Sequence, residues 1–456
     1  MPAVTVDITK KNGPIKPVNG IDNGPVCFGS LVDSSRYYKE AAFPYCRLHD
    51  TNYPHPREVD IPHIFRDFNA DPDDPKNYDF RATDVYLNEI LAVGSKIIYR
   101  LGVSIEHPGI KYFVDPPGDF DKWARICLNI ARHYNEGWAD GFRMGIDLWE
   151  VWNEPDGQHP DRKLDPMWSG TPEQYYELYA ITSKLFKKKM PGVKIGGYAA
   201  CGLLNEKLYS YFINFLEYIT KENAPLDFYS WHCYTSNIGD LVRNAQLARE
   251  GLDKYGYKDA ITICDEWNYT AGFIGIGGNK NIFDKWDGAR NRYEFFTQCS
   301  NEAGAAFTAA AMIAMLDMPL DIATLYTGDP TNYYATIFDH FGRPTKQFRA
   351  YDAFNRLKQE GGRLFAVSEE EGIRAAAAGT EKGFGILIAN YNSSSPVTEL
   401  KLKGLDNDAS WKYEVWTLDR WHDLEKTVER TLKTGELPKE IYPHRDTVEF
   451  IKLTKV

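Results

Sequence analysis

Two glutamates stand where apolar segments of the sequence end, and their side chains are the best candidates for catalytic chemistry. Residues 144–152 form a largely apolar, aromatic run that breaks off at Asn153-Glu154-Pro155. Residues 260–264 form a second apolar run, which ends at Asp265-Glu266. Short apolar runs bounded by turn residues are typical of buried strands. A carboxylate is too costly to leave unpaired inside such a strand, so both glutamates are candidate functional groups at strand ends.

A pair of carboxyl groups held close together can cleave a glycosidic bond, provided that the two differ in protonation. We expect Glu154 to carry a proton that it gives to the leaving oxygen, and later to activate water as a base. We expect Glu266 to stay ionised and to attack the anomeric carbon as the nucleophile. A separation of about 5–5.5 Å between the carboxyl groups favours retention of configuration, and one of about 6.5–9.5 Å favours inversion.

A structural role is the alternative for each acid. Glu154 or Glu266 alone could be a buried structural carboxyl group, and Asp265 competes with its neighbour for the role of nucleophile. Because side chains alternate along a strand, we expect Asp265 to point to the opposite side from Glu266. Glu150 lies deeper in the same strand as Glu154, and we interpret it as a group that supports the site.

The motifs predict neither a metal nor a cofactor. The histidines, aspartates and glutamates show no metal-ligand spacing such as H-E-x-x-H. The sequence has no G-x-S-x-G nucleophile elbow and no P-loop. Its seven cysteines are scattered without metal or redox spacing, which predicts buried free thiols.

Composition limits the partners and the location. A net charge of −11 without a basic stripe argues against nucleic acid. The longest apolar stretch, residues 303–316, has the length of a buried helix, so no membrane partner is expected. The first residues lack the charged start and apolar core of a secretory signal. We therefore expect a cytoplasmic protein, or a periplasmic or secreted one if a signal has been removed.

Strand-like and helix-like segments alternate along most of the chain. The predicted strands are residues 26–30, 42–49, 96–102, 146–152, 193–199, 226–234, 260–267 and 320–327. The predicted helices are residues 83–93, 119–136, 171–190, 240–256, 287–316 and 344–358. Asp119 and the capping-box residues Thr171 and Gln174 mark two of the helix starts. The glycine-rich stretch 272–278 is interpreted as a loop.

This alternation predicts an α/β fold, namely a (β/α)₈ TIM barrel over residues 21–359. A doubly wound open sheet is the alternative, but the phosphate-binding glycine turn typical of it is missing after the first strand. Residues 360–456 show short alternating runs between turn residues, which predicts a smaller accessory β-sandwich, completed by a strand in residues 1–20. Glu154 and Glu266 then follow the fourth and seventh barrel strands, whose ends face each other across the barrel mouth.

Four motifs together resemble the large clan of retaining (β/α)₈ glycosidases, and most closely glycoside hydrolase family 39, which contains β-xylosidases and α-L-iduronidases. The Arg-Phe-His motif of the family's second strand resembles Arg47-Leu48-His49, and its E-V-W-N-E-P is matched by residues 150–155. Its nucleophile segment resembles Glu266-Trp267-Asn268, and a His-x-Tyr after the sixth strand is matched at residues 232–234. The predicted barrel with its β-sandwich agrees as well.

The resemblance implies a role for each matched residue. Glu154 would be the acid/base and Glu266 the nucleophile. Asn153 would hold the sugar 2-hydroxyl, Tyr234 would donate to the nucleophile, and Arg47 would keep the nucleophile charged from below. The remaining residues implied at the substrate site are His49, His232, Trp267 and Asn268.

Two departures from the family pattern leave the identity of the sugar open. Arg100 follows Tyr99 where xylosidases usually carry a Glu, and it would either attract a substrate carboxylate or form a salt bridge at the strand end. Tyr326 stands where a Trp commonly forms the floor of the sugar subsite, and it is expected to contact substrate.

The expected function is a retaining exo-glycosidase that releases a terminal sugar from an oligosaccharide or glycoside, with a β-xyloside as the first choice. The alternatives within this mechanism are another pentoside, a uronide or an internal polysaccharide bond. An alternative of a different class is a catalytically silent carbohydrate-binding barrel. Clan members often assemble through their sandwich modules, so a homo-oligomer is also an expectation.

Overall fold

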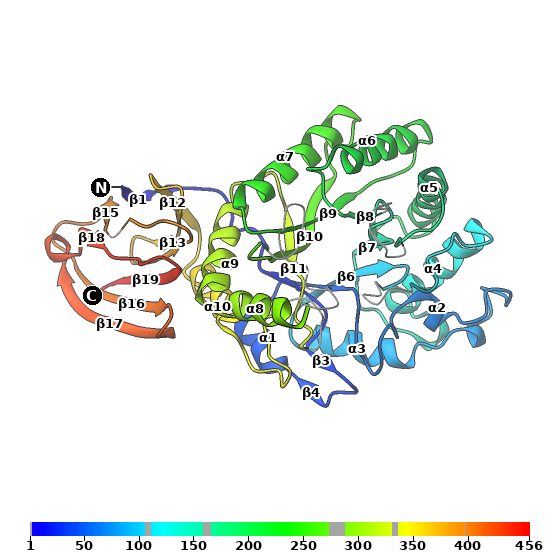
Figure 1. Ribbon diagram of the computed structural model, residues 1–456, viewed down its shortest axis with the longest axis horizontal. Coiled ribbons are helices and arrows are strands. Elements are labelled where there is room, and N and C mark those ends of the chain that lie inside the picture. The colour runs from blue at the N-terminus through cyan, green and yellow to red at the C-terminus, as the bar shows by residue number, and fades with distance from the viewer. Residues whose placement is uncertain (1, 105–110, 158–165, 273–287, 331–335, 396) are drawn as a thin grey trace.

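The computed structural model describes residues 2–104, 111–157, 166–272, 288–330, 336–395 and 397–456. The helix-flanked barrel and a second β-sheet lie side by side, and both chain termini lie on the second sheet (Figure 1). The proposed glycine-rich loop falls almost wholly at residues 273–287, outside the described residues.

Eight parallel strands close into a barrel, in the order β10-β11-β2-β5-β6-β7-β8-β9. The strands are β2 (Gly20–Asp22), β5 (Tyr45–Leu48), β6 (Lys96–Leu101), β7 (Leu148–Val151), β8 (Lys194–Ala200), β9 (Phe228–Thr235), β10 (Ile261–Tyr269) and β11 (Ile322–Leu325). The predicted (β/α)₈ barrel is confirmed, and β7 and β10 are its fourth and seventh strands.

The predicted first barrel strand at residues 26–30 is wrong. The first strand is β2, and residues 26–27 (β3) instead pair with residues 32–33 (β4) in a small antiparallel hairpin. Only three residues long, β2 is too short to show a hydrophobic period. Its Gly20 fits because a Cβ there would lie 2.7 Å from the carbonyl oxygen of Ala323 on β11.

Helices surround the barrel and bury their apolar faces against it (Figure 1). They are α1 (Ser35–Ala41), α2 (Ile61–Ile64), α3 (Arg81–Ala92), α4 (Phe120–Asn135), α5 (Pro172–Lys189), α6 (Glu206–Lys221), α7 (Ile238–Lys254), α8 (Gly288–Ser300), α9 (Glu302–Met315) and α10 (Lys346–Gln359). None of these helices is both long and apolar enough to cross a bilayer. The predicted caps at Asp119 and Thr171 are confirmed, since each accepts a hydrogen bond from its helix's third residue.

The predicted helix pattern was incomplete, and the short helices α1 and α2 were among the elements that it missed. The segment predicted as one helix over 287–316 is two, because Asn301 caps the start of α9 by accepting a hydrogen bond from the Ala303 amide. Helix α6 was not predicted, although Asn205 caps it and its buried face carries Leu208, Phe212 and Phe215.

The second sheet has nine strands in the order β17-β16-β19-β14-β13-β12-β1-β15-β18. They are β1 (Ala3–Lys11), β12 (Arg363–Ser368), β13 (Ile373–Thr380), β14 (Gly383–Asn390), β15 (Thr398–Lys403), β16 (Ser410–Leu418), β17 (Asp423–Lys433), β18 (Glu440–Ile441) and β19 (Thr447–Lys455). The N-terminal strand β1 pairs with β12 and β15.

One apolar core joins side chains from distant strands of this sheet, including Leu400 of β15 and Trp411 of β16. The sheet therefore curls over its own core like a sandwich. Its other side packs against α9 and α10. We propose the boundary between barrel and sheet at residues 359/360, where α10 ends.

Five apolar side chains fill the lower part of the barrel interior: Ile98, Leu148, Phe228, Ile263 and Ile322. Charged and polar residues occupy the strand ends above this layer. All seven cysteines are free, and all except the partly exposed Cys201 are buried, which confirms the prediction of free thiols.

Candidate active site

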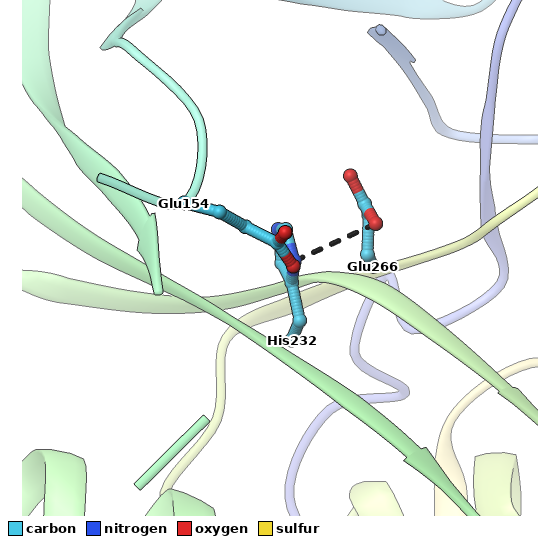
Figure 2. Close-up of side chains that lie close together, drawn as sticks. All are labelled: Glu154, His232 and Glu266. Carbon is cyan, nitrogen blue, oxygen red and sulfur yellow. Dashed lines mark hydrogen bonds and ion pairs between the residues drawn. The ribbon is translucent and has the colours of Figure 1, made fainter. Parts of the chain in front are cut away.

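Glu154 and Glu266 meet at the carboxyl ends of the barrel strands. Together with His232 of β9 they form a group in which one ligand atom of each residue lies within 4.8 Å of the others. Figure 2 shows the imidazole of His232 beside the carboxylate of Glu154, with Glu266 close by. The chain turns sharply after β7, with positive φ at Trp152 (74°) and Glu154 (47°), a conformation that is costly for residues other than glycine.

Arg47 of β5 lies beneath the pair and is completely buried. Its Nη1 donates to Glu266 Oε1 at 2.8 Å, and its Nη2 donates to Asn153 Oδ1 at 2.7 Å. Its Nε donates to Glu150 Oε2, also at 2.8 Å. The guanidinium thus links side chains of β7, of the segment after β7 and of β10. Its contact with Glu266 is the one that the family resemblance implied for Arg47, and Glu150 lies beneath the site as a supporting group.

Asp265 also faces the barrel interior, which contradicts the expectation that it points away from Glu266. Its Oδ2 lies 3.0 Å from Arg47 Nε, and its side chain is completely buried. The pairing of β10 with β9 shifts register between Cys264 and Glu266, so an irregularity in the strand breaks the alternation. Burial raises the pKa of Asp265 well above its ordinary value, although the charge of Arg47 opposes this.

Asp22 of β2 is a further buried acid beside Arg47 that the sequence motifs did not indicate. Its Oδ2 lies 3.3 Å from Arg47 Nη1. Burial raises its pKa well above the ordinary value, and the charge of Arg47 only partly offsets this. The Arg47 guanidinium thus lies among four buried carboxyl groups, those of Asp22, Glu150, Asp265 and Glu266.

His232 lies between the two candidate catalytic acids, and Tyr234 contacts one of them. Tyr234 Oη donates to Glu266 Oε2 at 2.6 Å, the contact that the family resemblance implied. His232 Nδ1 lies 2.8 Å from Glu154 Oε1 and 3.5 Å from Glu266 Oε2. Burial lowers the pKa of His232, but the charges of Glu266 and Glu154 outweigh it and raise that pKa overall.

The pKa of Glu154 moves opposite to the sequence-based expectation of a protonated acid. Burial raises this pKa, but the hydrogen bond from His232 and its positive charge outweigh burial and lower it overall. The two pKa shifts together favour a charged pair, in which His232 Nδ1 lies one hydrogen bond away from Glu154 Oε1.

His49, Asp50 and Tyr326 complete the surroundings of Glu266. His49 Nε2 lies 3.7 Å from Glu266 Oε1 and 3.5 Å from Asp50 Oδ1. Tyr326 Oη donates to Asp50 Oδ2 at 2.7 Å, and its ring packs edge-on against Tyr234. The sequence motifs predicted His49 and Tyr326 here but missed Asp50, although it directly follows the strand segment 42–49.

Three other residues predicted at the substrate site are buried within the protein. Trp267 is completely buried in the core around the barrel, because it points away from the interior. Asn268 donates to the Tyr326 carbonyl at 2.7 Å and so ties β10 to the segment after β11. Arg100 is buried with its Nη2 2.7 Å from Asp60 Oδ1, which is the salt bridge left open as the alternative.

Asp156 and Cys201 lie close to Glu154 on its other side, and no sequence motif indicated them. The Cys201 amide donates to Asp156 Oδ1 at 3.2 Å. Burial raises the pKa of Asp156 to about 7, and the nearby charge of Glu154 adds to this. The one sequence feature that could have indicated Asp156 as a neighbour of Glu154 is its position two residues later in the chain.

Comparison with known proteins agrees with this geometry. The model of the family described as "Glycosyl hydrolases family 39" matches residues 37–257. The (β/α)₈ barrel carries two carboxyl groups at its strand ends, and such a pair of acids is the catalytic equipment of most glycoside hydrolases. Within that class, the resemblance to glycoside hydrolase family 39 is confirmed by the match.

Two curated relatives are β-xylosidases. That of Geobacillus stearothermophilus is 28% identical over 187 residues, which are 38% of this chain and 34% of the relative. That of Caldicellulosiruptor saccharolyticus is 21% identical over 347 residues, which are 71% of this chain and 63% of the relative. The matches thus span about a third and somewhat under two thirds of the relatives' own length.

The crystal structure of a glucosidase from Croceicoccus marinus is similar over the full length. It is 25% identical with a TM-score of 0.80, and the match covers 100% of this chain and 99% of the glucosidase chain. The combination of barrel and second sheet is therefore shared by this enzyme.

Proposed function

We propose that this protein is a retaining glycoside hydrolase that acts by double displacement. The observation that carries the proposal is the approach of Glu154 and Glu266, whose nearest ligand atoms lie within 4.8 Å. Such an approach of the nearest oxygens favours the closer carboxyl spacing of retaining enzymes, roughly 5–5.5 Å, over the wider spacing of inverting ones.

In the first step, Glu266 attacks the anomeric carbon while Glu154 protonates the leaving oxygen. Arg47 and Tyr234 each bind one oxygen of Glu266, which aims the carboxylate and favours its ionised form. The proton on His232 Nδ1 passes to Glu154 Oε1 as the leaving oxygen develops negative charge. His232 thereby supplies the acid with the proton that its lowered pKa would otherwise deny it.

In the second step, Glu154 acts as a base towards water. Formation of the glycosyl ester removes the negative charge of Glu266, which lay 3.5 Å from His232 Nδ1. The ionised Glu154 takes a proton from water, the resulting hydroxide equivalent displaces Glu266 from the anomeric carbon, and the sugar leaves with its original configuration. Asn153, held by Arg47, is positioned to bind the sugar 2-hydroxyl.

The first choice of substrate is a terminal β-xyloside, because both curated relatives are named β-xylosidases. A glucoside is the second candidate, since the full-length structural match is to a glucosidase. Hydrolysis of a panel of nitrophenyl β-xyloside, β-glucoside, α-L-arabinoside, β-glucuronide and α-L-iduronide tests the proposal. Release of nitrophenol with retained configuration, followed by NMR, supports it, and binding of these sugars without any turnover would indicate a carbohydrate-binding barrel instead.

The His232–Glu154 pair predicts a pH window of stability. The pKa of His232 is raised above 6.5, so its contribution is complete below pH 6.5 and disappears as pH rises through the folded-state pKa. The pKa of Glu154 is lowered below 4.5, so its contribution is complete above pH 4.5 and disappears as pH falls through the folded-state pKa. Both contributions coincide between pH 4.5 and 6.5.

His232→Asn, which keeps a donor near Nδ1 but cannot be charged, should destabilise the protein by about 1–3 kcal/mol in this window. Urea unfolding from pH 3 to 9 measures the difference from the wild type, which should shrink towards both ends of the range. The exposed His340→Asn serves as control and should show no such maximum. A pH-independent loss for His232→Asn would contradict the charged pair.

A further inference from the structure

Four side chains in contact with one another surround the candidate nucleophile Glu266. One of them, Asp50, is an acid that has no role in the proposed displacement. Glu266 Oε1 is 3.7 Å from His49 Nε2, which is 3.5 Å from Asp50 Oδ1. Asp50 Oδ2 accepts from Tyr326, whose ring packs against Tyr234, and Tyr234 donates to Glu266 Oε2. Asp50 therefore lies two contacts away from Glu266 by way of His49 and three by way of the two tyrosines, close to where a sugar bound to Glu266 would have to lie.

The backbone conformation at Asp50 supports a functional role for this residue. Asp50 follows the end of β5 and has a φ of 54°, in the left-handed region that favours glycine. Aspartate tolerates this region better than most residues, but strained backbone is typical of functional sites. Its side chain is only 8% exposed, so its carboxyl group is largely withdrawn from water.

The chemistry of the group indicates its ligand. An ionised carboxylate accepts hydrogen bonds and donates none, and its two oxygens can bind two donors side by side. Adjacent hydroxyl groups of a neutral sugar are such donors, whereas a sugar carboxylate is not. Oδ2 is oriented by Tyr326, and Oδ1 lies on the side of His49 and Glu266.

We propose that Asp50 selects the sugar, by binding neighbouring hydroxyls of a neutral glycone and repelling a uronate. The inference rests on the proposed function, since it assumes that the glycone lies against Glu266. A uronate would bring a third carboxylate beside Asp50 and Glu266. The Arg47 guanidinium below already binds Glu150, Asn153 and Glu266, so among the described residues it offers a uronate little compensation.

The test compares nitrophenyl β-glucoside with nitrophenyl β-glucuronide, which differ only at C6, alongside the β-xyloside. The wild type should cleave the neutral substrates and favour glucoside over glucuronide. Asp50→Asn keeps the shape but lacks the charge, so kcat/KM on neutral substrates should fall by about 10–100-fold, as for the loss of charged hydrogen bonds. The preference for glucoside over glucuronide should shrink at least tenfold.

Two further variants separate this role from a structural one. Tyr326→Phe removes the hydrogen bond to Asp50 and should reduce the preference for glucoside in the same direction, but less strongly. The control is Asp259→Asn, at an exposed position just before the N-terminal end of β10, which should leave the preference unchanged. Thermal unfolding checks that each variant is folded. An Asp50→Asn enzyme with unchanged kcat/KM or unchanged preference overturns the inference while leaving the proposed function intact.

If the wild type hydrolyses none of the nitrophenyl glycosides, calorimetric titration with D-xylose and D-glucuronate still tests the selection by Asp50. Selective binding of xylose that Asp50→Asn abolishes would support the selection by Asp50 although the proposed hydrolysis had failed. Equal binding of both sugars, or selectivity that Asp50→Asn retains, would overturn it.

Discussion

Glu266→Ala is expected to lower kcat on every glycoside by on the order of 10⁴- to 10⁶-fold, a loss typical of removing a catalytic nucleophile. The reason is geometric as well as chemical. Arg47 and Tyr234 hold the two oxygens of Glu266 at 2.8 and 2.6 Å, so the wild-type carboxylate is aimed at the sugar before substrate binds. Steady-state kinetics with a nitrophenyl glycoside measures the loss.

Azide should restore turnover of Glu266→Ala, because the truncated side chain leaves space below the anomeric carbon for a small anion. Arg47 remains there as a cation to attract it. The product should be the glycosyl azide of inverted configuration, identified by NMR. Retained activity without azide, or a rescued product of the original configuration, would remove Glu266 from the role of nucleophile.

Asp265→Asn is the matched control, since Asp265 is the neighbouring acid and also contacts Arg47. Burial raises the pKa of its carboxyl group well above the ordinary value, which favours the neutral form, so an amide should replace it with little loss of activity. Azide should form no glycosyl azide with this variant. A rescued product here would identify Asp265 as the nucleophile and would make the adjacent Glu266 a supporting group.

Local patterns of the sequence were sufficient to predict most of the barrel. Seven of the eight strands coincide with the predicted apolar runs, and the caps at Asp119 and Thr171 follow from local hydrogen bonds. The exception, β2, exists because Gly20 lets it fit between β11 and β5. That reason is tertiary, and no local pattern expresses it.

Residues of the candidate site could be predicted where a motif coincides with the end of a strand. They could not be predicted where tertiary packing determines the position of the side chain. Glu154, Glu266 and Arg47 meet as their motifs imply. The inward turn of Asp265 depends on an irregularity of β10, and the proximity of Asp22 depends on the register of β2 with β5. Asp50 acquires its place through the Tyr326 contact across 276 positions of the chain, which no short motif could reveal.

Protonation could not be predicted from residue types alone. The sequence indicates that two acids must differ in protonation, but it does not contain the 2.8 Å contact from His232 to Glu154. That contact reverses the direction in which burial would move the pKa of Glu154. The proposed acid therefore has to be considered together with the histidine that is hydrogen-bonded to it.

Glu154→Ala should separate substrates by the quality of their leaving groups. A dinitrophenyl glycoside departs without a proton, so its first step should stay within about tenfold of the wild type. An alkyl glycoside or disaccharide needs the proton and should lose about 10²–10⁴-fold in kcat/KM, the range of general acid catalysis. Equal losses on both substrates would argue that Glu154 has a structural role instead.

Glu154→Gln distinguishes loss of the proton from loss of packing. The amide keeps the shape of Glu154 and an acceptor oxygen for His232 Nδ1, but it cannot receive and pass on a proton. It should therefore show the same dependence on the leaving group as Glu154→Ala. If Glu154→Gln instead cleaved disaccharides at the wild-type rate, the proton would have to reach the leaving oxygen from His232 directly, and the histidine alone would be the acid.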